Sequence, residues 1–124
     1  MIKVKKWSDI HEQRFRDGDK RYVIKNLISL ASELPVQEMP LEHLCISFLK
    51  PKIESLFEFV CQVKTTLEAD LNCPIILDEE GYVMDGRHRI ARAILEGKET
   101  IKFVRFNETP KPDYYSETKN KAST

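Results

Sequence analysis

The sequence predicts a small α+β domain in which a mixed β-sheet packs against helices. At 124 residues the chain can bury a core but is short for two domains of ordinary size. Apolar residues recur at helical spacing in several stretches, and short apolar runs bounded by turn residues lie between them. Helical and strand patterns of this kind within one short chain are typical of the α+β class.

Two helices are expected at the start of the chain. Ser8 can cap a short helix that ends near Gly18, because a serine oxygen accepts a hydrogen bond from a first-turn amide. A second helix is expected to run from about Lys20 to Pro35. Its apolar stripe consists of Val23, Leu27, Leu30, Ala31 and Leu34. Residues 1–35 are therefore predicted to form an N-terminal helical extension.

The next segment predicts a short strand followed by a long helix. "VQEMPLEHL", residues 36–44, has the composition of a strand and turn, although Pro40 limits the strand to a few residues or to a sheet edge. Pro51 suits the first position of a helix, since proline has no N–H to leave unpaired there. The apolar residues at helical spacing are Ile53, Leu56, Phe57, Val60, Val63, Leu67 and Leu71.

The third part predicts a hairpin, a helix and a final strand. "CPIILDEEGYVMDG" has apolar runs on both sides of an acidic turn that ends in Gly81, which indicates a β-hairpin. Asp85 can cap the helix that follows, and Gly97 can end it. The core-facing residues of this helix are expected to be Ile90, Ala93 and Ile94. "TIKFVRF" is expected to be the last strand. The polar segment 107–124 is predicted to be mostly disordered.

Composition narrows the class of function. Lys plus Arg and Asp plus Glu number 20 each, so the whole molecule lacks the basic field of a generic nucleic-acid or membrane-surface binder. No apolar run approaches the roughly 20 residues that span a bilayer, and the first residues do not form a signal peptide. Three widely spaced cysteines fit reduced thiols better than disulfides or zinc. We expect a cytoplasmic protein with no membrane partner.

The candidate site is the turn "DGRHR", residues 85–89. Helix starts usually prefer acidic groups, because first-turn N–H groups carry partial positive charge, yet three basic residues stand here in a row. A bound anion resolves the conflict. Gly86 allows close approach to the main chain, Arg87 and Arg89 offer forked hydrogen bonds, and His88 can titrate near neutral pH. The alternative is a solvated helix start in which Asp85 is a cap and an ion-pair partner of the basic residues.

One further basic residue of this helix is a secondary candidate. Arg92 lies one turn after His88 and Arg89, so it shares their side of the helix and can reach an outer phosphate. For chemistry on a phosphate, the nearest carboxylates in sequence are Asp85 and the hairpin acids Asp78, Glu79 and Glu80. Asp85 is a weak catalytic candidate, because a cap is its more ordinary role, and the hairpin acids are expected to be a solvated turn.

Residues 36–106, and above all "DGRHR" with Ala91 and Ala93 behind it, resemble the ParB/sulfiredoxin superfamily. In that family a strand ends in a glycine-led basic motif that opens a helix and binds nucleotide phosphates. The resemblance implies a ParB/sulfiredoxin-like fold with phosphates at Gly86, Arg87, His88 and Arg89. Lys50, beside Pro51, resembles a further basic residue that contacts phosphate in the family.

This chain departs from the better-known members of the family. Sulfiredoxins carry a catalytic cysteine in a "GCHR"-like turn, and Arg87 stands at that place here. Partitioning ParB proteins resemble "GERRxRA", whereas "GRHRIARA" lacks the glutamate and has Ala91 at the third arginine. We therefore expect neither sulfinic acid reduction nor complete ParB function.

Two functions stay open at this stage. The first is binding of a nucleotide such as ATP, CTP or ADP, with Mg²⁺, and with hydrolysis or phosphoryl transfer to a small molecule as the enzymatic option. The second is a nucleic-acid-associated accessory or regulatory protein, ParB-like in DNA binding or a nuclease, that uses the same turn for backbone phosphate. Residues 85–105 carry six Lys or Arg against three Asp or Glu, a local excess that permits such contact.

Overall fold

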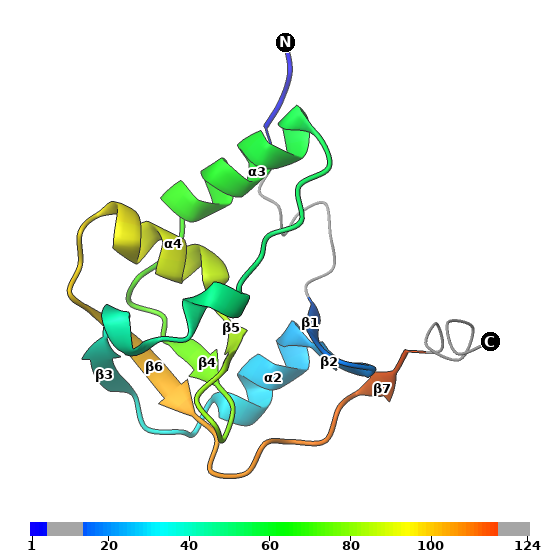
Figure 1. Ribbon diagram of the computed structural model, residues 1–124, viewed down its shortest axis with the longest axis vertical. Helices are drawn as coiled ribbons and strands as arrows, with labels where there is room; N and C mark the ends of the chain where they lie inside the picture. The colour runs from blue at the N-terminus through cyan, green and yellow to red at the C-terminus, as the bar shows by residue number, and fades with distance from the viewer. Residues whose placement is uncertain (5–13, 117–124) are drawn as a thin grey trace.

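The computed structural model describes residues 1–4 and 14–116 of the chain (Figure 1). Their strands form two small sheets. One is antiparallel and has the order β1-β2-β7, with β1 at Arg14–Asp17, β2 at Lys20–Val23 and β7 at Tyr114–Tyr115. The other is mixed and has the order β3-β6-β4-β5. The α+β class predicted from the sequence is confirmed.

The mixed sheet is the centre of the fold. Its strands are β3 (Gln37–Pro40), β4 (Ile75–Leu77), β5 (Val83–Asp85) and β6 (Thr100–Arg105). β4 and β5 form the antiparallel hairpin that the sequence predicts, and β6 lies parallel to β4. The parallel pairing requires the chain to cross over between the two strands, and α4 (Arg87–Leu95) lies in that connection.

Helices cover both faces of this sheet. Successive side chains of a strand point to opposite faces, so the sheet contributes to two cores. Ile76 belongs to the core under α2 (Ile24–Ala31), whereas Ile75 and Leu77 belong to the core under α4. The helix α3 (Leu56–Leu67) packs on α4 and forms an outer layer, as Figure 1 shows. Two 3₁₀ turns, Leu41–His43 and Ile46–Phe48, lead from β3 toward α3.

The start of the chain differs from the predicted pair of helices. Residues 5–13, which include Ser8, lie outside the described residues, but Arg14–Asp17 and Lys20–Val23 are strands joined by a turn at Gly18, where φ is +61°. The helix begins only at Ile24. Sequence periodicity missed the hairpin because β2 also pairs with β7, a partner from the other end of the chain.

The predicted disordered tail also differs from the structure over residues 107–116. β7 pairs with β2, and Asp113 accepts hydrogen bonds from the Val23 amide at 2.7 Å and from Asn26 Nδ2 at 2.9 Å. Residues 117–124 lie outside the described part. The domain boundaries at residues 35 and 106 stay predictions, although α2 and Phe106 share one core with the mixed sheet.

α3 begins later than predicted, and it turns a different side to the core from the one that the apolar stripe predicts. Ser55, not Pro51, starts it: the Ser55 hydroxyl accepts from the Glu58 amide at 3.1 Å, and the Glu58 carboxylate accepts from the Glu54 amide at 2.9 Å. The buried residues of α3 are Cys61, Gln62 and Thr65. Most of the predicted apolar stripe is exposed, with Leu56, Phe57, Val63 and Leu67 among its exposed members. In α4, Ile90 and Ala93 are buried as predicted, but Ile94 is exposed.

Within residues 1–4 and 14–116, we found no helix with the length and apolar character needed to cross a bilayer.

Candidate functional site

The turn between β5 and α4 depends on Gly86. This residue is the N-cap of α4 and has φ +118°, a left-handed backbone conformation that residues other than glycine rarely adopt. A Cβ at Gly86 would overlap Ile75 Cγ2 and lie 2.8 Å from Ile75 Cβ. The sequence interpretation assigned the missing side chain to ligand approach. The structure gives a different reason, which is that the helix start packs directly against strand β4.

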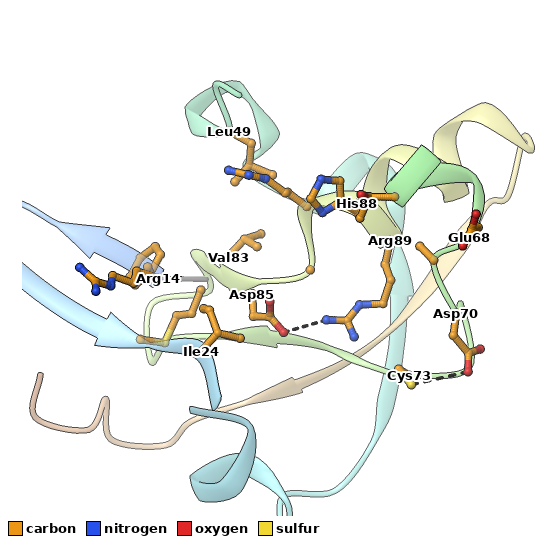
Figure 2. Close-up of a pocket in the computed structure, with 16 residues that line it drawn as sticks. Arg14, Ile24, Leu49, Glu68, Asp70, Cys73, Val83, Asp85, His88 and Arg89 are labelled. Atoms are coloured by element: carbon orange, nitrogen blue, oxygen red, sulfur yellow. Dashed lines mark hydrogen bonds and ion pairs between the residues drawn. The ribbon is translucent and has the colours of Figure 1, made fainter. Parts of the chain in front are cut away.

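A cavity of about 320 Å³ lies in front of this helix start. Its lining includes the whole turn from Asp85 to Arg89, Arg14 and Phe15 of β1, and the segment that follows α3. Figure 2 shows the side chains of Asp85 and Arg89 between Arg14 on one side and Glu68, Asp70 and Cys73 on the other. The cavity therefore joins the predicted phosphate turn to residues from distant parts of the chain.

Asp85 and Arg89 form an ion pair within the turn. Arg89 Nη2 donates to Asp85 Oδ2 at 2.7 Å, and the two side chains are only 18% and 12% exposed. Arg89 Nη1 also donates to the Pro74 carbonyl at 3.3 Å. The prediction that Asp85 caps α4 is wrong, because the N-cap residue is Gly86 and the Asp85 carboxylate is directed to Arg89 instead. Arg89 consequently fastens α4 to β5 and the start of β4.

His88 is directed to α3. His88 Nε2 lies 2.5 Å from Gln62 Oε1, and since an amide oxygen accepts, the imidazole proton is on Nε2. Burial, followed by the charges of Arg87 and Arg89, lowers the pKa of His88 to about 4. The expectation of a histidine that titrates near neutral pH is therefore wrong. His88 is neutral at physiological pH and acts as a hydrogen-bonding group.

Arg87 lies at the boundary of two cavities. Burial lowers the pKa of its guanidinium, while the Asp85 charge raises it, and an arginine in this setting stays charged at any physiological pH. Arg87, His88 and Leu49 line the 320 Å³ cavity and also a second cavity of about 510 Å³. The second cavity lies between α3, α4 and the segment that precedes α3, and its lining is mostly aliphatic.

Arg92 and Lys50 do not line the cavity at the turn. Arg92 Nε donates to Glu96 Oε2 at 2.5 Å, and Arg92 Nη1 donates to the Ala69 carbonyl at 2.6 Å, so its guanidinium holds α4 to the end of α3. Lys50 is exposed and lines neither cavity. The structure thus brings together Asp85 to Arg89 of the predicted site and leaves these two basic residues outside it.

The hairpin acids have local roles. Asp78 Oδ1 accepts from the Glu80 amide at 2.9 Å and the Tyr82 amide at 2.8 Å, which organises the turn between β4 and β5. The Glu79 carboxylate accepts from the Thr109 amide at 3.2 Å. None of the three hairpin acids lines either cavity.

Sequence reasoning missed four residues that complete the two cavities. Arg14, Glu68 and Asp70 line the cavity at the turn, and Gln62 lines the larger one. Arg14, Glu68 and Asp70 have no sequence signal, since their proximity to the turn is set by tertiary packing alone. Gln62 had a weak signal, because it is a polar residue in an otherwise apolar helical stretch.

The described residues contain no cluster of three or more His, Cys, Asp or Glu side chains able to hold a metal ion by themselves. Comparisons of the chain with models of protein families, with curated proteins and with solved structures found no match. The resemblance to the ParB/sulfiredoxin superfamily therefore stays a prediction based on the "DGRHR" turn.

Proposed function

We propose that the protein binds a nucleotide, with its phosphates in the cavity at the start of α4. One observation carries the proposal: the N-cap of α4 is Gly86, which has no side chain to cap the helix, and the helix start opens onto a cavity lined by Gly86, Arg87, His88 and Arg89. The first intrahelical backbone bond runs from the Ile90 amide to the Gly86 oxygen, so the preceding amides have no acceptor within the helix. Such a helix end favours an anion.

The charges around the cavity support a phosphate accompanied by a cation. Arg87 and Arg14 supply positive charge beyond that of the helix end, and Glu68 and Asp70 supply negative charge. Figure 2 shows Glu68 and Asp70 on the opposite side of the cavity from Arg14. Mg²⁺ is commonly bound by one or two carboxylates together with substrate phosphates, and needs no complete protein cage. A Mg²⁺–nucleotide complex thus matches a cavity that has both basic and acidic walls.

We assign the residues of the turn different roles from those expected from the sequence. Arg87 is the residue we assign to direct phosphate contact, because it lines the cavity at the helix start and its guanidinium stays charged at physiological pH. Arg89 supports the site by fixing the helix start. His88, neutral and bonded to Gln62, orients the turn instead of adding a charge.

Hydrolysis or phosphoryl transfer needs a base near the phosphates. Asp85 is engaged in an ion pair with Arg89, and Glu68 and Asp70 are the other carboxylates at the cavity. The proposal is therefore made for binding, with catalysis as a further question that the same experiment answers.

Nucleic-acid contact at the same turn has less support. Of the basic residues counted between 85 and 105, Arg89 and Arg92 are paired with Asp85 and Glu96. These pairs reduce the local positive charge on which the alternative depends.

Calorimetric titration with ATP, CTP, GTP and ADP, with and without Mg²⁺, tests the proposal. We expect saturable binding of at least one nucleotide, weakened about tenfold or more by Arg87→Gln, which removes a charge-assisted contact. Arg16→Gln is the matched control, because Arg16 is an exposed arginine of β1 that does not line the cavity. Phosphate release, measured on the same samples, reports hydrolysis. Absence of heat with every nucleotide would refute the proposal.

A further inference from the structure

The exposed face of α3 is apolar although the helix is packed on the rest of the molecule. Leu67 is 54% exposed and Leu56 is 78% exposed, whereas the buried side of the helix carries Gln62 and Thr65. An amphipathic helix ordinarily turns its apolar side to the core. Apolar residues of this face, among them Phe59, Val63 and Leu67, line the 510 Å³ cavity, whose volume is within the range of small-molecule pockets.

One polar group of this cavity lacks a partner. Gln62 lines the cavity and is 7% exposed, and its amide oxygen is bonded to His88. Its amide Nε2 is buried and has no hydrogen-bond partner among the described residues. A buried amide donor is ordinarily paired, and leaving it unpaired costs free energy. An acceptor atom on a bound molecule would satisfy it.

The charge of the cavity indicates the type of acceptor. Arg87 is the one charged side chain in the described lining, and no Asp or Glu belongs to it. The cavity at the turn is different, since three carboxylates accompany its arginines. A low-polarity cavity with a single positive charge favours a ligand with one negative charge and an apolar body.

We propose that the cavity between α3 and α4 binds an amphipathic carboxylate, such as a medium-chain fatty acid. The carboxylate accepts a hydrogen bond from Gln62 Nε2 and pairs with the Arg87 guanidinium. The apolar chain lies along α3 and α4, in contact with Phe59, Val63 and Ile94. The site goes beyond the proposed nucleotide function, because its distinguishing residues do not line the cavity at the turn.

Titration calorimetry with sodium decanoate, below its micelle concentration, is the direct test. Decyltrimethylammonium is the matched probe, because it has the same chain length and the opposite charge. We expect saturable binding of one decanoate per chain, and at least tenfold weaker binding of the cation, since Arg87 attracts only the carboxylate. Equal affinity for the two probes would overturn the proposal.

Two variants locate the site. Gln62→Leu removes the unpaired donor while keeping a side chain of similar size, and should weaken decanoate about tenfold. Ala91→Trp fills the cavity from its exposed side and should abolish binding. Leu30→Trp is the control, since Leu30 is exposed on α2 and lines neither cavity. Circular dichroism confirms that each variant is folded.

The outcomes separate this proposal from the previous one. Ala91→Trp should leave nucleotide affinity unchanged, because Ala91 does not line the cavity at the turn, so either ligand can fail without the other. Decanoate binding that survives Ala91→Trp, or that Leu30→Trp removes equally, would show general surface adsorption and overturn the site. Light scattering gives the remaining result: a stable dimer that binds no decanoate would mean that a second copy covers this face, and the proposal would be wrong.

Discussion

The helices α2 and α3 both have apolar residues at helical spacing, but α2 buries most of its apolar side chains and α3 exposes most of them. α2 buries Ile24, Leu27 and Ala31, with Leu27 only 1% exposed, although Leu30 of the predicted stripe is exposed. It has no side-chain cap of its own, and Asp113 binds the backbone at its start. α3 is capped locally by Ser55 and exposes most of its apolar residues.

The difference teaches that amphipathic periodicity identifies a helix but not the surface that its apolar side meets. α2 exists because tertiary packing covers its stripe, as is usual for short helices. α3 is longer, is capped by its own sequence, and packs on α4 through a polar and small-residue face. The exposed apolar residues of α3 are therefore available for a ligand. Four experiments test this contrast, in order of decreasing effect.

Truncation of one leucine in each helix gives the largest contrast. Leu27→Ala should lower the free energy of unfolding by about 3 kcal/mol, because it leaves a cavity in a packed core. Leu67→Ala should lower it by less than about 0.5 kcal/mol, since Leu67 is half exposed. Urea denaturation of both variants measures the difference. Similar losses in the two would show that α3 buries its apolar face after all.

Acid should loosen the contact between α3 and α4. The pKa of His88 is lowered to about 4 in the fold from 6.5 when unfolded, so between these values the unfolded chain binds more protons. The contribution of His88 to stability is complete above pH 6.5 and is lost as pH falls toward 4. We expect about 1–2 kcal/mol, allowing for solvent screening of a partly exposed ring.

Urea denaturation at several pH values, compared with His88→Gln, isolates this term from the carboxylates. The free energy of unfolding of the native protein, relative to that of His88→Gln, should be smaller at pH 4.5 than at pH 7. A difference independent of pH would mean that the folded protein accepts the proton at His88 without cost.

Removal of a helix cap should act locally. Ser55→Ala removes the bond to the Glu58 amide and should cost about 1 kcal/mol. Hydrogen exchange should accelerate in α3 and stay unchanged in α2. Asp113→Ala is the reciprocal variant, because it removes the bonds to Val23 and Asn26 and should affect α2 alone. Faster exchange in both helices for either variant would contradict independent stabilisation.

Gln62→Leu should have the smallest effect on stability. The substitution removes an unpaired buried donor, which favours folding, and breaks the bond to His88, which opposes it. We expect a net change below about 1 kcal/mol in thermal denaturation. A loss of more than about 2 kcal/mol would show that Gln62 is needed for folding, and not mainly for a ligand.

Local sequence signals predicted the part of the fold that local interactions determine. The hairpin around Asp78, α4 and the strand at Thr100–Arg105 were expected and are present. The strands at Arg14–Asp17 and Lys20–Val23 were not, because they depend on each other and on Tyr114–Tyr115 across the chain. The orientation of α3 could not be predicted from the sequence either. Periodicity shows where the apolar stripe of a helix lies, but not which surface packs against it.

The candidate site shows the same division. The sequence singled out Gly86 to Arg89 as a unit, and these residues do line one cavity. Arg89 pairs with Asp85 four residues earlier, a spacing that the sequence shows, but the further bond of Arg89 to Pro74 and the bond of His88 to Gln62 depend on tertiary structure. Neither partner is close in sequence, so neither role was predictable from spacing.

Arg87, His88 and Leu49 are a common wall of the two cavities. Two ligands that both bound at Arg87 would be thermodynamically linked, and such linkage is reciprocal. If a nucleotide bound at Arg87 changes the affinity for an apolar acid by some factor, the acid must change the affinity for the nucleotide by the same factor. The protein would then respond to the ratio of two metabolites, with one arginine as the point at which their concentrations are compared.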